Sequence, residues 1–193
     1  MGLRVKTRVK TIRNGIEAGT SIPFHQDGGN VGEWIEEQLS NNGHQVSDGN
    51  VPDLEDLGVE VKSRKIGSNS KHTIGTMTPK AIARTPYRKS SIFKKIQQQY
   101  RVKYDDDLRV VVSSEVLDFR DEFIQKHIED AYEAGRAQIK EFIKDGHKFP
   151  SYVPGTEFGH FDKQKTSYQF RIPDAAMNKI EHIAKSQFKK LFD

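Results

Sequence analysis

The chain has 193 residues, of which 34% are apolar and 30% are charged, and it contains no cysteine. The absence of cysteine excludes disulfides, a cysteine nucleophile and cysteine-ligated zinc or iron–sulfur sites. No run of about eighteen apolar residues is present, so we expect no membrane span. The basic segment Met1–Arg13 is not followed by an apolar stretch. We therefore expect no signal peptide and a cytoplasmic protein.

Apolar spacing in the first half of the chain predicts strands and two helices. Val31, Trp34, Ile35 and Leu39 recur at helical spacing, whereas the run at 57–65 alternates as a strand does. In chain order, the predicted segments are a strand or basic arm at 3–13, a loop at 14–30, a helix at 30–40, a polar loop at 41–52, a strand at 57–65, its partner strand at 72–78 and a basic helix at 90–100.

The second half predicts a buried strand, a long charged helix, a further strand and a last helix. The β-branched run Val110–Val112 is typical of a buried strand. Gly135 is a position where the long helix could break. The predicted segments are a strand at 108–113, a helix at 119–145, a loop at 146–166, a strand at 168–172 and a helix at 174–192 that Asp174 caps.

One motif at the first predicted strand contains residue types that could bind a metal ion and catalyse a reaction. Glu60 and Lys62 are two residues apart in an alternating run, so their side chains point to one face, while Val59 and Val61 point into a core. A preceding loop can bring Asp53 beside them. Two carboxylates and an ammonium group at one point can hold Mg²⁺ and activate water against a phosphodiester. The alternative is an ordinary turn followed by an edge strand with a surface ion pair.

The charge of the chain is concentrated in one segment. From Val61 to Tyr104 there are twelve Lys or Arg residues and no Asp or Glu, whereas the rest of the chain has nineteen basic and 27 acidic residues. Such a cationic block is typical of a surface that binds a polyanion. Arg88 and Lys89 belong to it and are expected to contact DNA. The alternative is a solvated basic face without a partner.

Glu36 lies beside the apolar face of the helix predicted at 30–40. From there its carboxylate could complete an acidic triad with Asp53 and Glu60. The alternative is a solvent-facing glutamate in a row with Glu33 and Glu37.

Further basic residues could contact DNA. Lys94 or Lys95 on the predicted basic helix could stabilise the cleaved phosphate, while the other faces solvent or the DNA backbone. Arg171 follows a loop that carries Lys163 and Lys165, and could read guanine from a groove. A surface ion pair is the alternative for Arg171.

Competing catalytic templates are absent from the sequence. The seven histidines are scattered without close pairs at ligand spacing. The chain has no HExxH motif, no Gly-rich Walker loop and no GxSxG elbow. The acidic motif with its lysine is therefore the main candidate for chemistry.

These elements, in this order, resemble the MutH family of PD-(D/E)xK endonucleases, which includes the strand-nicking endonuclease of mismatch repair and related type II restriction enzymes. The resemblance covers about residues 28–180. The motifs that carry it are Gly29-x-x-Gly32-x-x-x-Glu36, Asp53-x6-Glu60-Val61-Lys62, Ser90-Ser91-Ile92-Phe93-Lys94-Lys95 and Tyr168-Gln169-Phe170-Arg171. The chain departs from the family in a longer loop after Glu36, in an extra residue, Ile172, and in the acidic Asp174.

The resemblance implies an α/β (α+β) fold with a PD-(D/E)xK restriction-endonuclease-like core, a mixed central β-sheet flanked by helices. It implies a single nuclease domain over residues 1–193, in which a catalytic lobe of about 1–115 and a DNA-reading lobe of about 116–193 can be distinguished.

The resemblance also implies roles for single residues. Asp53, Glu60 and the Val61 carbonyl would bind one or two Mg²⁺ ions, and Glu36 would help to hold the second ion or its water. Lys62 would orient and help to deprotonate the attacking water, Lys95 would contact the scissile phosphate, and Arg171 would read DNA.

We therefore expect a sequence-specific, Mg²⁺-dependent endonuclease of double-stranded DNA that leaves 5′-phosphate ends. A type II restriction enzyme, monomeric or homodimeric, is the first hypothesis. The alternatives are a MutH-like mismatch-repair nicking endonuclease and a DNA-binding module without catalysis.

Overall fold

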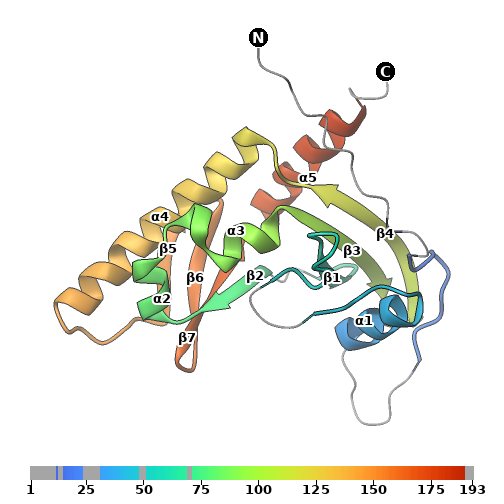
Figure 1. The fold of residues 1–193 in the computed structure, drawn as a ribbon, viewed down its shortest axis with the longest axis horizontal. Helices are drawn as coiled ribbons and strands as arrows, with labels where there is room; N and C mark the ends of the chain where they lie inside the picture. The colour runs from blue at the N-terminus through green and yellow to red at the C-terminus, as the bar shows by residue number, and fades with distance from the viewer. Residues whose placement is uncertain (1–11, 13–14, 24–30, 48–50, 69–70, 190–193) are drawn as a thin grey trace.

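The computed structural model describes the chain except residues 1–11, 13–14, 24–30, 48–50, 69–70 and 190–193, and the side chains of 187–189. The basic arm expected at 3–13 and part of the loop at 14–30 therefore lie largely outside the described residues. Within the described part, five α-helices and two β-sheets form a mixed α and β architecture (Figure 1). None of these helices is long and apolar enough to cross a membrane.

The smaller sheet has three strands in the order β1-β3-β4, formed by Glu60–Lys65, Gln98–Asp105 and Val110–Asp118. β1 runs parallel to β3, and β4 is antiparallel to β3. Helix α1 (Val31–Asn41) packs on β1 and buries the four apolar residues whose spacing predicted it. Val59 and Val61 are buried in this smaller core, as the alternation predicted.

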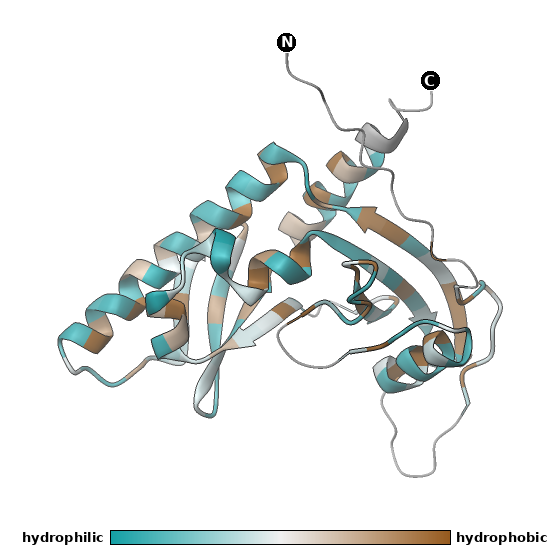
Figure 2. Cartoon of the chain, viewed as in Figure 1, coloured by the Kyte–Doolittle hydropathy of each residue, from teal (hydrophilic) through white to brown (hydrophobic). Residues whose placement is uncertain are grey.

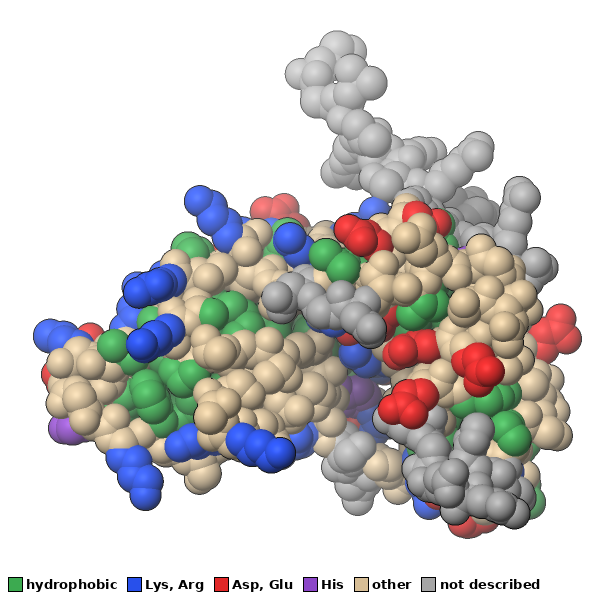
Figure 3. Space-filling view, turned by 60° about the horizontal axis from the view of Figure 1, so that its bottom comes forward, with side chains coloured by type: hydrophobic (Ala, Val, Ile, Leu, Met, Phe, Trp, Pro, Cys, Tyr) green, Lys and Arg blue, Asp and Glu red, His purple; other side chains and the backbone are tan. Residues whose placement is uncertain are grey.

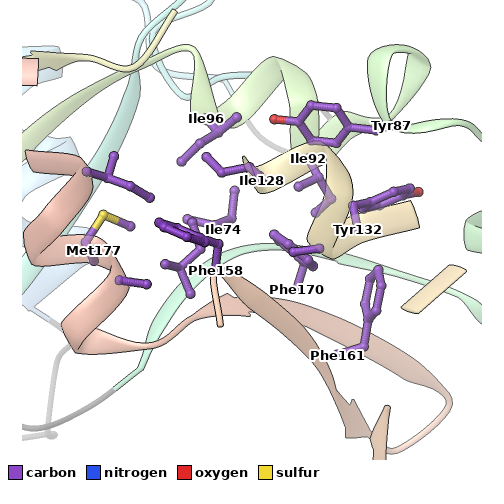
Figure 4. Packing of buried hydrophobic residues seen from close by; sticks show 14 of the residues in the cluster. Ile74, Tyr87, Ile92, Ile96, Ile128, Tyr132, Phe158, Phe161, Phe170 and Met177 are labelled. Carbon is purple, nitrogen blue, oxygen red and sulfur yellow. The ribbon is translucent and has the colours of Figure 1, made fainter. Parts of the chain in front are cut away.

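The larger sheet has four antiparallel strands in the order β2-β7-β6-β5, formed by His72–Met77, Ser167–Ile172, Gly159–Gln164 and Tyr152–Thr156. Helix α4 (Glu122–Lys144) packs on β5 and β6. Its outer side is hydrophilic (Figure 2). Its inner side joins a core rich in aromatic rings, in which Tyr132, Phe161 and Phe170 pack together (Figure 4).

Short helices and the last helix complete the larger core. Helix α2 (Pro79–Arg84) packs on α4, the 3-10 helix η1 (Tyr87–Lys89) follows it, and α3 (Ser91–Ile96) packs on β2 and β3. Helix α5 (Asp174–Lys189) begins one residue after Pro173 and places Met177 and Ile180 in the same core. Lys185 of α5 forms an ion pair with Glu115 of β4, so α5 reaches the smaller sheet as well.

Several predicted segments are confirmed and others are corrected. The helices α1, α4 and α5 and the strands β1 and β7 are present within a few residues of their predicted bounds, and β4 is present but ends five residues later than predicted. The described strands form two sheets, of which the smaller is mixed, as was expected of the central sheet. The strand at 72–78 was expected to pair with β1, but β2 pairs with β7 in the other sheet. Apolar residues between 74 and 96 contribute to the larger core.

Three strands escaped prediction. The helix expected at 90–100 ends at Ile96, and β3 begins at Gln98, because pairing with β1 and β4 outweighs the helical propensity of the glutamines. Residues 146–166 were expected to be a loop, yet they contain β5 and β6. Pro154 is tolerated because β5 is an edge strand. Gly159 lies where a side chain would collide with the ring of Phe170.

The long helix is not broken at Gly135. A β-carbon at this position would lie 2.6 Å from Cδ2 of Phe161 on β6. The glycine therefore allows α4 to approach the sheet closely. Strand β4 also differs from its expectation, because Val112 is 45% exposed.

Candidate active site

A tight turn brings Asp53 beside the first strand. The backbone groups of Leu54 and Val59 are hydrogen-bonded to each other in both directions, at 2.9 and 3.1 Å. Gly58 has a φ of 66°, a left-handed conformation that favours glycine. The turn reverses the chain, so that Oδ2 of Asp53 accepts a hydrogen bond of 2.8 Å from the Val61 N–H. The loop-and-strand arrangement predicted from the sequence is therefore present.

Four charged side chains meet at this turn. Nζ of Lys62 lies 2.6 Å from Oε1 of Glu60, beside it on the same face of β1. Nζ of Lys95, which comes from α3, lies 3.2 Å from the same Glu60 oxygen and 3.9 Å from Oδ1 of Asp53. Two carboxylates and two ammonium groups thus converge from the turn, a strand and a helix. We call Asp53, Glu60, Lys62 and Lys95 the acidic–lysine cluster.

Glu60 is the most buried member of the cluster. Its side chain is 1% exposed, and its Oε2 finds no hydrogen-bond partner among the described residues. Burial raises the pKa of the Glu60 carboxyl above its usual value, Lys62 and Lys95 oppose this rise, and Asp53 adds to it. A buried polar atom without a partner costs about 1–3 kcal/mol, and more when it is charged. The oxygen is therefore placed where an additional positive group would stabilise it.

The backbone at Val61 adds a further oxygen donor. β1 is an edge strand, so alternate residues present their N–H and C=O groups to the free edge. The N–H of Val61 points away from β3, because it is bonded to Asp53. The carbonyl of a strand residue points to the same side as its N–H, so the Val61 carbonyl also faces the free edge near Asp53.

These donors fit a divalent cation of the Mg²⁺ type. Mg²⁺ takes oxygen ligands and is commonly held by one or two carboxylates together with substrate phosphates and water. Asp53, Glu60 and the Val61 carbonyl supply such oxygens, and the unpartnered Oε2 of Glu60 is among them. Lys62 and Lys95 place positive charge against the same carboxylates.

Glu36 does not complete the predicted triad in this structure. The apolar residues of α1 pack on the smaller core. They therefore lie on the face of the sheet to which Val61 points. Among the described residues, no three acidic or histidine side chains form a group that could hold a metal ion. Asp53 and Glu60 are thus brought together, but Glu36 does not join them.

Apart from Lys95, the predicted DNA-contacting residues lie in two places outside the acidic–lysine cluster. Lys94 is exposed on α3 beside Lys95, and Lys89 is exposed in η1. Arg88 of η1 forms an ion pair of 2.7 Å with Glu129. These residues extend positive charge from the cluster along α3 and η1.

The other predicted contacts lie on the larger sheet. Lys163 and Lys165 border an apolar cavity of about 710 Å³ at the end of the β6–β7 hairpin. Arg171 on β7 is 26% exposed, lies 3.5 Å from Asp162 and donates to the side chain of Gln169. The ion pair that was the alternative for Arg171 is therefore present.

A second cluster of charged residues was missed by the sequence interpretation. Arg101 of β3 is buried and forms an ion pair with Glu181 of α5. Arg64 of β1 contacts both His72 of β2 and Asp174 of α5. Burial, together with the positive charges of Arg101 and Arg64, lowers the pKa of His72 to about 3. The cluster links the two sheets and the last helix.

The sequence does contain a pattern that could have predicted this second cluster, because polar and apolar residues alternate over 99–103 as in a strand. Gln99, Arg101 and Lys103 alternate with Tyr100 and Val102 and point to the face of the sheet that carries Glu60. The helix predicted over the same residues concealed this pattern.

Comparisons with known proteins add no family assignment. A scan against models of protein families found no match, and a search of curated proteins found no match either.

Proposed function

We propose that this chain is a Mg²⁺-dependent DNA endonuclease with a PD-(D/E)xK core of the MutH-like kind. The observation that carries the proposal is the acidic–lysine cluster, in which Asp53, Glu60, Lys62 and Lys95 converge from three separate segments. Oε2 of Glu60 is buried and has no hydrogen-bond partner in the part of the chain that the structure describes, which supports a role for the cluster beyond structural ion pairing.

Each residue of the cluster has a separate role in the proposed phosphodiester hydrolysis. Asp53, Glu60 and the Val61 carbonyl would hold the cation, which supplies charge neutralisation and acidifies water when it is bound. Lys62 is 31% exposed and lies next to Glu60, so its ammonium group can orient a water molecule. Lys95 can place positive charge against the phosphate oxygens as negative charge develops. Water attacks phosphorus and releases a proton to the solvent, the P–O3′ bond breaks, the leaving 3′-oxygen takes up a proton from the solvent, and the products are a 5′-phosphate and a 3′-hydroxyl.

Double-stranded DNA is the proposed substrate because the segments that follow Glu60 carry a block of positive charge. All twelve basic residues between Val61 and Tyr104 lie in β1, β2, β3 or the segments between them, without one acidic residue among them. Acidic side chains gather instead on the part of the surface that carries α1 (Figure 3). A type II restriction enzyme is the specific activity that we propose.

The proposal is tested by incubating the protein with supercoiled plasmid in Mg²⁺, with and without EDTA. We expect discrete linear fragments in Mg²⁺ and intact plasmid in EDTA. Lys62→Ala should lower the cleavage rate by about 10²–10³-fold, the size of effect seen when one charge-stabilising group is removed. Lys144→Ala, at the exposed end of α4, is the matched control and should cleave as the wild type does.

The same gel separates the alternatives. Open-circular product alone would favour the nicking endonuclease over the restriction enzyme. Retarded plasmid that is never cut would leave only a DNA-binding module. Cleavage by Lys62→Ala at the wild-type rate would contradict the roles assigned to the acidic–lysine cluster.

A further inference from the structure

A basic cavity lies between the two sheets, directly beside the acidic–lysine cluster. Its volume is about 400 Å³, and Lys62 and Gln99 form part of its lining. The lining includes no Asp or Glu, and its basic members are Lys62, Arg64, Lys65, Lys71, Arg101 and Lys103. Lys, Arg and His side chains are visible in the recess between the two parts of the molecule (Figure 3). We call this space the basic cavity.

The strands arrange the basic side chains as a ladder. Lys62 lies opposite Arg101, and Arg64 lies opposite Lys103, in the parallel register of β1 and β3. Residues two apart on a strand share a face and are separated by about 6.6 Å. This step is comparable to the spacing of neighbouring phosphates along one nucleic-acid strand. The pairs Lys62–Arg101 and Arg64–Lys103 therefore present positive charge at the interval at which a DNA strand presents negative charge.

The inner end of the basic cavity offers a hydrogen-bond donor. Gln99 lies opposite Glu60 in the register and its side chain is fully buried. Its Oε1 accepts a hydrogen bond of 3.1 Å from Arg101, but its Nε2 finds no partner among the described residues. A buried amide donor without a partner is suited to an acceptor that arrives with a ligand.

The acidic partners of these cations lie outside the lining. Glu181 forms an ion pair with Arg101, and Asp174 forms one with Arg64, both from α5. These contacts fix the two guanidinium groups in place. Lys103 is held less firmly, because its Nζ is 3.8 Å from Glu181 and its side chain is 32% exposed. Lys103 is thus more available to a ligand than Arg64 or Arg101.

We propose that the basic cavity binds the backbone phosphate two positions from the scissile phosphate on the cleaved strand of duplex DNA. The inference rests on the proposed function and names a contact that the sequence interpretation did not include. Lys103 neutralises this phosphate, the guanidinium groups of Arg64 and Arg101 supply the surrounding positive potential, and Gln99 donates at the inner end, beside Glu60. The path of the DNA strand follows β1 and β3.

The test measures duplex binding in EDTA, so that no cleavage is needed. For B-DNA, the logarithm of the affinity falls with the logarithm of salt concentration with a slope of about −0.9 for each phosphate neutralised. Lys103→Gln should reduce this slope by about 1 and weaken binding several-fold at low salt. Lys144→Gln removes the same charge at the far end of α4 and should leave the slope unchanged. Circular dichroism and thermal melting establish that both variants are folded.

A second arm separates DNA from a free anion. Inorganic phosphate is titrated at constant ionic strength while thermal unfolding is followed. If phosphate stabilises the wild type but not Lys103→Gln, and the variant leaves the DNA slope unchanged, then the basic cavity is a site for a free anion and the inference is overturned. An unchanged slope without such stabilisation overturns it as well.

A third arm locates the phosphate once the cut has been mapped. A neutral methylphosphonate is placed at each backbone position around the cut. The position that weakens wild-type binding but not Lys103→Gln should be the phosphate two positions from the cut, and any other position contradicts the inference. Cleavage with a normal slope for Lys103→Gln would remove this inference and keep the proposed function. If the slope is reduced for Lys103→Gln but no cleavage is observed, this inference is kept and the proposed function is removed.

Discussion

The four-stranded sheet and the three-stranded sheet of this molecule are stabilised by different chemistry. Around the larger sheet, Tyr132, Phe161 and Phe170 pack with ring centroids 5.1–5.9 Å apart. The buried hydroxyl of Tyr132 donates to the Thr85 carbonyl at 3.0 Å. Around the smaller sheet, a core of mostly aliphatic residues adjoins buried charge. Among the described residues, Oε2 of Glu60 and Nε2 of Gln99 have no hydrogen-bond partner there, and Nε2 of His160 is such an atom on the larger sheet.

The difference indicates that the larger region mainly provides stability and that the smaller region carries the candidate chemistry. Aromatic burial in the larger region supplies stability that the charged face of the smaller region does not supply. Buried carboxylates with raised pKa values and unpartnered polar atoms are costly, and they concentrate at sites that bind or catalyse. The following substitutions test whether stability and chemistry are separated in this way.

Phe161→Ala should cause the largest loss of stability. The ring is fully buried between α4 and the larger sheet, so its removal leaves a cavity among aromatic neighbours. Truncation of a buried phenylalanine costs about 3–5 kcal/mol. Urea denaturation followed by circular dichroism measures the effect. A loss below 1 kcal/mol would mean that the larger core is not the main source of stability.

Gly135→Ala should destabilise the protein by about 1–3 kcal/mol, because the new methyl group would press on Phe161. Helix propensity alone predicts the opposite sign, since alanine is favoured over glycine by about 1 kcal/mol. Ala137→Gly, two residues along α4 and exposed, is the matched control and should lose about 1 kcal/mol. Stabilisation by Gly135→Ala would show that α4 does not approach β6 so closely.

His72 should make stability depend on pH. Its pKa in the folded protein is lowered to about 3 from the ordinary value of 6.5, so the unfolded chain takes up a proton first as the pH falls. Stability due to the neutral imidazole is present above pH 6.5 and is lost between that value and about 3. The expected slope is at most about 1.4 kcal/mol for each pH unit. His72→Gln should remove this contribution, and an equal slope in both proteins would contradict the assignment.

The sequence predicted the acidic motif better than its surroundings. Strand alternation alone placed Glu60 and Lys62 side by side, and the family resemblance added Lys95 from a distant segment. The contributions of Arg101 and Gln99 could not be predicted while their segment was interpreted as a helix. Glu36 was placed on the correct helix, but only the packing of α1 decides which way the helix faces.

Sheet membership was the least predictable part of the fold. β2 follows β1 directly in the chain, yet it pairs with β7, almost a hundred residues later. Local alternation indicates that a segment is a strand but not which strand it pairs with. The division into two sheets depends on long-range packing of the aromatic core, which no local pattern contains.

The central claim is that the acidic–lysine cluster binds a divalent cation, and Mn²⁺ titration followed by electron paramagnetic resonance tests it most directly. The wild type with duplex DNA should bind at least one Mn²⁺ ion. Asp53→Asn should lose that binding while keeping its fold, because the amide oxygen can still accept from the Val61 N–H. Equal Mn²⁺ binding by the wild type and Asp53→Asn, or no binding by either, would contradict the account.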